Sequence, residues 1–196
     1  MAEPIVLMVG LGNPGPEYIH TRHNAGFWFI DAVAHQTGAR LKHESRFHGE
    51  VARATIAGRQ VWLLKPATYM NRSGLAVAAL ANFYKITPGA ILVVHDELDF
   101  EPGVVRLKEG GGHAGHNGLK DIAAQLGTPA FARARLGVGR AAAAAAKVDY
   151  VLSKPLASER LLTEQAIAAT LHELPKLVAG EWEKAQMALH GRDKAP

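Results

Sequence analysis

Near its N-terminus the chain reads Pro4-Ile-Val-Leu-Met-Val9-Gly10-Leu-Gly12-Asn13-Pro-Gly15. The first six residues form a short apolar run closed by a glycine, which is typical of a buried strand. Asn24 predicts the N-cap of a helix that follows and ends at Gly38. A buried strand, a glycine-rich turn and a helix in this order indicate an α/β protein.

Apolar runs and helical patterns alternate over the rest of the chain. The predicted strands are 47–56 and 60–64, joined as a hairpin across 57–59, then 90–94, 103–107 and 133–138; the predicted helices are 73–84, 117–126 and the segment from 158 onward, broken at Pro175. This order predicts a single three-layer α/β/α domain over residues 1–196 with a central mixed β-sheet. Ligands bind beyond the carboxyl ends of such strands, so we expect the site after Val9, Leu64, Val94 and Leu107.

Composition narrows the function. The 196 residues are 48% hydrophobic and 20% charged, as in a soluble globular protein, and they include no cysteine. Disulfides and thiolate chemistry are therefore excluded, and we expect a cytoplasmic protein. No run approaches the ~18 apolar residues of a membrane span, so no membrane contact is expected. The net charge is +4, but residues 106–154 carry +5, which indicates either a phosphate-bearing partner or a solvated basic face.

The first glycine motif has the spacing of a dinucleotide fingerprint. Pro16 stands where the helix should begin, and Pro16-Glu17 occupies the place of the Lys-Ser/Thr pair of a P-loop. No acidic residue ends a second parallel strand about 20 residues later, where a ribose-binding carboxylate belongs. We therefore interpret the glycines as a tight turn that presents Asn13 at the edge of the sheet.

Histidine and aspartate follow the predicted strands. His23 precedes the first helix and can act as a general base near neutral pH. Asp96 directly follows an apolar strand and could orient that imidazole, although a turn or capping role stays open. The pairs His20/His23 and His113/His116 invite a metal interpretation, but both lie in loops flanked by glycine or proline and lack a third ligand.

Two further loops carry amide groups. In Tyr69-Met70-Asn71-Arg-Ser73-Gly74, the asparagine either caps a helix or aims its amide at a carbonyl or water. A serine nucleophile is not expected, because no G-x-S-x-G elbow surrounds Ser73. Residues 110–118 contain five glycines ahead of a predicted helix, so backbone amides can approach a ligand closely.

Together these motifs resemble bacterial peptidyl-tRNA hydrolases. The matching segments are Gly10-Leu-Gly-Asn13-Pro-Gly15, Tyr18, Thr21-Arg-His23-Asn-Ala-Gly26, Tyr69-Met70-Asn71-Arg-Ser-Gly74, His95-Asp96-Glu-Leu-Asp99 and Gly110-Gly-Gly-His-Ala-Gly115-His116-Asn117-Gly-Leu-Lys-Asp121. They run from about residue 5 to residue 152 in the order and spacing of the family. The C-terminal helix matches only in character.

The resemblance implies hydrolysis of the ester between a peptide and the 3′-terminal ribose of tRNA. On this basis His23 is the base that activates water, Asp96 is its partner, and Asn13 distinguishes peptidyl-tRNA from a free aminoacyl ester. The residues implied to line the substrate are Tyr18, Tyr69, Met70, Asn71, Gly115, His116 and Asn117. Lys108 and Arg135 match the pair that clamps the tRNA 5′-phosphate in the family, and both lie in the basic segment.

The chain departs from the family at one place. Relatives carry mixed residues ahead of a final lid strand, whereas this chain has the run Ala141–Ala146, which reads as a short helix or a mobile linker. Any tRNA contact there would rest on the flanking Arg140 and Lys147. Arg135 rather than Arg133 matches the family when positions are counted back from the glycines that follow.

An ester is a better acyl donor than an amide, so a base and amide hydrogen bonds suffice for its hydrolysis. We therefore expect no metal and no cofactor. The expected partner is peptidyl-tRNA, held by its acceptor end and 5′-phosphate, and the expected state is a monomer. Two alternatives stay open: an oxidoreductase that binds a nicotinamide or flavin cofactor at the first glycine motif, and an RNA-binding module without catalysis.

Overall fold

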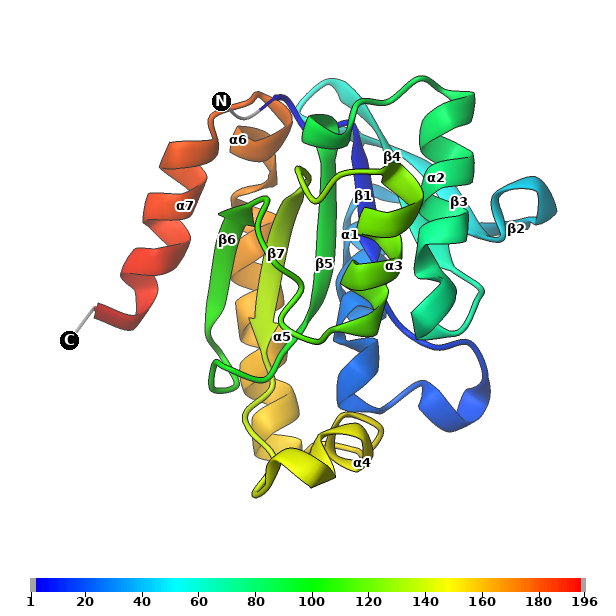
Figure 1. Ribbon diagram of the computed structural model, residues 1–196. Coiled ribbons are helices and arrows are strands. Elements are labelled where there is room, and N and C mark those ends of the chain that lie inside the picture. The colour runs from blue at the N-terminus through cyan, green and yellow to red at the C-terminus, as the bar shows by residue number, and fades with distance from the viewer. Residues whose placement is uncertain (1–2, 195–196) are drawn as a thin grey trace.

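The structure is a computed structural model that describes residues 3–194. One mixed seven-stranded sheet runs through it in the order β2-β3-β4-β1-β5-β7-β6, with helices on both faces (Figure 1). The predicted three-layer α/β/α fold with a central mixed sheet is thus confirmed. Residues 1, 2, 195 and 196, which the predicted domain includes, lie outside the described residues.

Four parallel strands form the middle of the sheet. They are β1 (Leu7–Gly10), β4 (Arg59–Pro66), β5 (Ile91–Glu97) and β7 (Ala132–Gly137). Antiparallel strands flank them, namely β3 (Gly49–Ile56) and β2 (Lys42–Glu44) beyond β4, and β6 (Val105–Glu109) beyond β7. The predicted hairpin is confirmed as β3 and β4, joined by a two-residue turn in which Ala57 and Gly58 both have positive φ.

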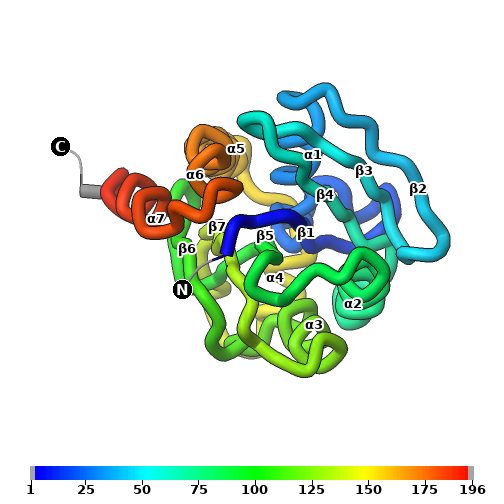
Figure 2. Tube along the Cα trace, turned by 90° about the horizontal axis from the view of Figure 1, so that it is seen from above, coloured from blue at the N-terminus to red at the C-terminus, as the bar shows by residue number. Residues whose placement is uncertain are grey.

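The helices cover the two faces unequally (Figure 2). One face carries α1 (Ala25–Thr37), α5 (Ala157–His172), α6 (Leu174–Val178) and α7 (Trp182–Gly191), and the other carries α2 (Ser73–Phe83) and α3 (Asn117–Leu126). Each face has its own apolar core. The short α4 (Lys147–Val151) stands apart, beyond the carboxyl ends of the parallel strands (Figure 1). Among residues 3–194, no helix combines the length and the apolar character needed to cross a bilayer.

Close packing explains the glycines after β1. A Cβ atom on Gly10 would lie 2.1 Å from the carbonyl oxygen of Gly26, and one on Gly26 would lie 2.4 Å from the backbone nitrogen of Leu11. The first turn of α1 therefore rests directly on the end of β1. A Cβ on Gly12 would lie 2.7 Å from the ring of Phe27, so protein atoms occupy the space that a pyrophosphate would need in a dinucleotide cradle.

The structure differs from the sequence analysis at one predicted site and adds detail at two segments. The prediction that a site directly follows Leu107 is wrong, because β6 is antiparallel to β7 and ends at the opposite edge of the sheet. The strand β2 was not predicted, because its three residues are exposed or half-buried and show no apolar pattern. The alanine run ends in a 3₁₀ turn, Ala144–Ala146, that continues into α4, so the element over the site is a helix rather than a lid strand.

Candidate active site

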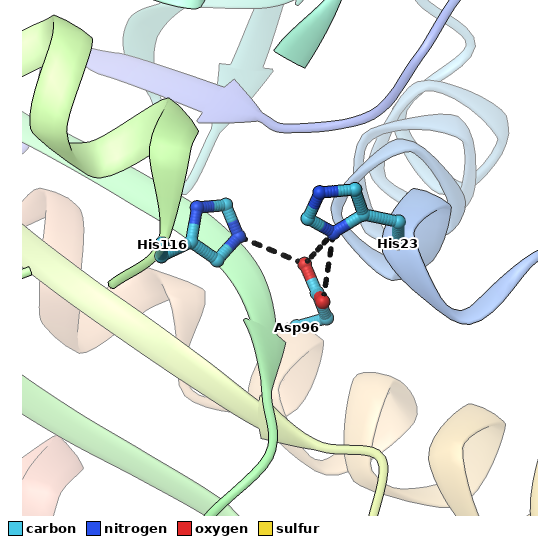
Figure 3. Close-up of side chains that lie close together, drawn as sticks. All are labelled: His23, Asp96 and His116. Carbon is cyan, nitrogen blue, oxygen red and sulfur yellow. Dashed lines mark hydrogen bonds and ion pairs between the residues drawn. The ribbon is translucent and has the colours of Figure 1, made fainter. Parts of the chain in front are cut away.

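Three side chains from distant parts of the chain meet at the carboxyl ends of the strands (Figure 3). Asp96 ends the apolar run of β5 and is 3% exposed. The Nδ1 atom of His23 lies 2.9 and 3.0 Å from its two carboxylate oxygens, and the Nε2 atom of His116 lies 2.9 Å from Oδ1. The two imidazoles therefore approach one carboxylate from opposite sides.

The hydrogen bonds fix the protons of this cluster. An ionised carboxylate only accepts, so His23 Nδ1–H and His116 Nε2–H must both donate to Asp96. His116 is also the N-cap of α3, where its Nδ1 accepts from the backbone N–H of Gly118 at 3.2 Å and of Leu119 at 3.5 Å. His116 is therefore held as a neutral ring. In neutral His23 the lone pair lies on Nε2, the atom turned away from Asp96.

Electrostatics tune the cluster in the direction that a base requires. Burial alone would lower the pKa of His23, but the negative charge of Asp96 and the hydrogen bond to it outweigh burial and raise that pKa above 6.5. Burial opposes ionisation of Asp96, yet the two imidazoles hold its pKa well below 3.8. Asp96 thus stays ionised, and His23 becomes a stronger base than a free imidazole.

His95, the residue next to Asp96, has a different state. Its ring is fully buried, and burial together with the neighbouring His116 lowers its pKa to about 3. Its Nδ1–H donates to the backbone oxygen of Asp96 at 2.8 Å. His95 is therefore neutral throughout the physiological range and packs edge-on against His116, with ring centroids 4.9 Å apart.

Asn13 is positioned by two partners. Its side-chain Oδ1 accepts from the backbone N–H of Met70 at 2.7 Å. The side chain of Asn24 accepts from the backbone N–H of Asn13 at 2.8 Å and donates to its carbonyl oxygen at 3.0 Å. Asn24 thus holds the predicted N-cap position of α1 but makes no capping bond, because its side chain braces the Asn13 loop instead. The Nδ2–H groups of Asn13 have no partner within residues 3–194 and can donate to a ligand.

A cavity of about 430 Å³ opens beside these residues. Nine of the predicted site residues line it: Asn13, His23, Tyr69, Met70, Asn71, Asp96, Gly115, His116 and Asn117. Tyr18 does not line it but meets Tyr69 at its rim, edge to face, with ring centroids 6.4 Å apart. Lys108 and Arg135 lie outside the cavity, on β6 and β7.

The glycine loop carries His116 from the far edge of the sheet to the cavity. Buried Arg133 anchors this loop by donating to the carbonyl oxygens of Gly112 at 2.5 Å and Gly111 at 2.7 Å. Gly110, Gly111 and Gly115 have positive φ values of 64°, 96° and 80°, which only glycine adopts without strain. The loop therefore depends on its glycines for its path and on Arg133 for its position.

The helix α4 closes one side of the cavity with Lys147, which flanks the alanine run, and with three apolar residues that were not predicted: Val148, Val151 and, just after the helix, Leu152. The i, i+3, i+4 spacing of the three apolar ones is a helical signal that could have revealed this element. Arg22, adjacent to His23, fastens it through hydrogen bonds to Ser153 Oγ at 2.5 Å and to the carbonyl oxygen of Tyr150 at 3.2 Å. The guanidinium also lies 4.0 Å from the ring centroid of Tyr150.

A cluster of cations, the basic strip, occupies one face of the β6–β7 pair. Arg106 is paired in register with Arg135, and Lys108 with Arg133, so all four side chains lie on the same face. The guanidinium of Arg133 is hydrogen-bonded to the glycine loop. Neither Lys108 nor Arg135 forms an ion pair with any described residue. As diagonal neighbours they lie about 7–8 Å apart along the ladder.

His23, Asp96 and His116 also form the one cluster of possible metal ligands among residues 3–194, with ligand atoms within 4.8 Å of one another. A metal would have to replace the N–H protons by which both imidazoles hold the carboxylate. Hydrogen bonding already accounts for the whole arrangement. The absence of a metal from the reaction stays a prediction.

Comparison with known proteins identifies the family. The family model for peptidyl-tRNA hydrolase matches residues 7–196. Similar proteins include the peptidyl-tRNA hydrolases of Neisseria gonorrhoeae (strain NCCP11945), 55% identical over 98% of this chain and 100% of the relative, and of Methylococcus capsulatus, 58% identical over 94% and 98%. The crystal structure of peptidyl-tRNA hydrolase from Acinetobacter baumannii matches with a TM-score of 0.94 at 47% identity, covering 97% of this chain and 96% of that one. The chain therefore belongs to the bacterial peptidyl-tRNA hydrolase family and is an enzyme that hydrolyses peptidyl-tRNA.

Proposed function

We propose that the chain cleaves the ester between the peptide and the 3′-terminal ribose with His23 as general base. Water binds between Nε2 of His23 and the ester carbonyl, gives its proton to Nε2 and attacks the carbonyl carbon. The tetrahedral intermediate then expels the ribose oxygen, which takes the proton back from His23. One water is consumed, and free tRNA and peptide are released. The 2.9 Å contact between His23 Nδ1 and Asp96, at the wall of an open cavity, carries this proposal.

The amides around the cavity supply positioning. Asn13 donates from Nδ2, since its Oδ1 is engaged by Met70, and this donor suits a peptide carbonyl oxygen. Asn71 and Asn117 line the same cavity and offer both donors and acceptors to the peptide backbone, the ribose or the water. A substrate with variable side chains must be held through such backbone contacts. Tyr18, Tyr69, Met70, Gly115 and His116 complete the substrate-binding surface.

We assign the tRNA end of the substrate to the basic strip. A phosphate between Lys108 and Arg135 would contact two cations that form no close ion pair with a described carboxylate, and this supports their role as the clamp for the 5′-phosphate. The acceptor end then reaches from the strip to the cavity. We propose that residues 1–196 act as one domain and as a monomer in the cytoplasm, where translation produces the substrate, without a metal or cofactor.

Hydrolysis of a blocked aminoacyl-tRNA by the purified protein, with a chelator present, tests the mechanism. We expect free tRNA to be released by the wild type and not by a His23→Ala variant that binds tRNA with the same affinity. A chelator-sensitive reaction would instead assign the trio of ligands to a metal. Wild-type turnover by the variant would remove His23 from the reaction. A fluorescence titration with NAD(P) checks the oxidoreductase alternative, and we expect no binding in the micromolar range.

A further inference from the structure

A second cavity, of about 420 Å³, lies on the other side of Asn13. We call it the upstream cavity; it is lined by Asn13, Pro14, Gly15, Pro16, Ile19, Asn24, Phe27, Trp28, Asp31, Glu50, Lys65, Pro66 and Ala67. Its walls come from the loop after β1, from α1, from the end of β4 with the residues that follow it, and from Glu50 on β3. Most of these side chains are apolar, and Asn13 lines both cavities. Asn13 therefore stands between the active site and the upstream cavity.

The charged groups of this cavity are arranged to present negative charge. Lys65 Nζ lies 2.8 Å from Asp31 Oδ1 and 3.6 Å from Glu50 Oε2. The lysine side chain is only 13% exposed, whereas the two carboxylate side chains are 53% and 44% exposed. The ammonium also sits 5.0 Å from the ring centroid of Phe27, which covers it further. The rim is therefore acidic, and an acidic rim repels phosphate groups.

The position of the cavity separates it from the basic strip. In the sheet, β4 lies on one side of β1 and the β6–β7 pair lies on the other, with β5 and Asp96 between them. The substrate has two arms that meet at one ester, a polyanionic tRNA and a peptide. With the tRNA drawn toward β6 and β7, the peptide arm is left to run toward β4.

We infer that the upstream cavity binds the peptide residues that precede the one esterified to tRNA, and that it favours apolar or basic side chains over acidic ones. This inference rests on the proposed function, because it takes Asn13 to hold the peptide at the ester. The apolar walls and the acidic rim match this occupant. The same rim opposes a nucleotide of the tRNA.

A substrate series that differs only in peptide length tests the inference. Kinetics are measured with tRNA carrying one, two or three blocked residues of apolar character. For the wild type we expect KM to fall by about tenfold from one residue to three, the scale of burying one apolar side chain. In Ala67→Phe, which fills the cavity from an exposed position, this gain should disappear while the one-residue substrate reacts as before. The control Ala124→Phe, at an exposed position of α3, should keep the full gain.

A second variant and a comparison of acidic with basic peptide residues provide independent tests. Ile19→Ser removes an apolar wall that is 52% exposed, and it should reduce the length gain without filling the cavity. A substrate with glutamate at the peptide residue before the esterified one should have a higher KM for the wild type than a substrate with lysine there. The variant Glu50→Gln should show a smaller difference in KM between these two substrates.

Four results separate failure of the inference from failure of the proposed function. A wild type that shows no length gain overturns the inference, as does an Ala67→Phe variant that loses activity equally on all substrates, and both leave the proposed function intact. An inverted charge preference, with glutamate favoured over lysine, also overturns it. If the wild type hydrolyses none of the substrates, the proposed function itself fails.

Discussion

Two charged regions of the molecule are built in opposite ways. At Asp96 every charge has a partner: the carboxylate is buried and accepts from two imidazoles at 2.9 Å, and one of these imidazoles is itself held by the backbone of α3. On the basic strip, cations gather on one face of β6 and β7, and Lys108 and Arg135 are left without an ion pair among the described residues. The first arrangement fixes positions and protons, whereas the second leaves charge open to a partner.

The difference separates chemistry from affinity. A base must be oriented to within a fraction of an ångström, so a buried carboxylate holds it by hydrogen bonds. Attraction to a polyanion needs only uncompensated charge near the surface. Substitutions at Asp96 and its partners should therefore change kcat, and substitutions on the strip should change KM and its salt dependence.

His23→Ala should have the largest effect. We expect kcat to fall by about 10²- to 10⁴-fold, the usual contribution of a general base, while tRNA affinity stays nearly unchanged. Single-turnover hydrolysis and a separate tRNA-binding titration measure the two quantities. A large loss of tRNA affinity together with normal turnover would erase the contrast between the two regions.

Asp96→Asn should reduce kcat by about 10²-fold, because the base survives but loses its orientation and its tautomer. It should also move the pH profile. In the wild type, activity falls as the pH drops through the raised pKa of His23, since protonated Nε2 cannot accept a proton. Without the carboxylate charge, burial alone lowers that pKa, so the acidic limb should shift to lower pH. If the acidic limb of the pH profile does not shift, it reports the titration of a group other than His23.

His116→Ala tests whether the second imidazole acts through Asp96. Loss of one hydrogen bond to the carboxylate should lower kcat by about tenfold. The acidic limb of the pH profile should move as well, which a purely structural role in capping α3 would not cause. His95→Gln is the comparison, because His95 touches Asp96 only through the backbone oxygen and should leave the limb in place.

Lys108→Ala should have the smallest effect on turnover. We expect KM for tRNA to rise, kcat to stay constant, and the slope of log affinity against log salt to shrink by about one. Lys184→Ala, on an exposed lysine of α7 that pairs with Glu181, is the control and should keep the slope. A slope that is equal in both variants would contradict the proposed phosphate clamp.

Local patterns predicted the elements well. The helix α3 occupies the predicted range 117–126, and α1 ends at a left-handed Gly38 as predicted, because a glycine stop acts within one turn. The helix α1 also begins after Asn24, although the side chain of Asn24 makes no capping bond. The meeting of His23 with Asp96 followed from one topological rule, that parallel strands end at the same edge. The direction of β6 did not follow, because five residues of apolar alternation carry no information on whether the neighbouring strand is parallel.

Contacts that depend on the whole fold were out of reach. Nothing in the sequence around His116 shows that its ring turns back from the N-terminus of α3 to reach Asp96 on β5. Arg133 and Arg135 look alike in sequence, yet Arg133 is buried under the glycine loop and Arg135 is partly buried beside Phe100. Such assignments depend on which neighbour a side chain meets after the sheet has formed.

The attachment of α4 has a consequence for how the enzyme tolerates change. Arg22 and Tyr150 fasten this helix from its C-terminal end, and the alanine run before it offers only methyl groups. The alanine run that leads into α4 therefore offers no side-chain polar group to fasten it. The segment at the C-terminal end of α4, in contrast, is hydrogen-bonded to Arg22, the residue next to His23. We therefore expect a change of chain length before α4 to disturb His23 less than the same change after it.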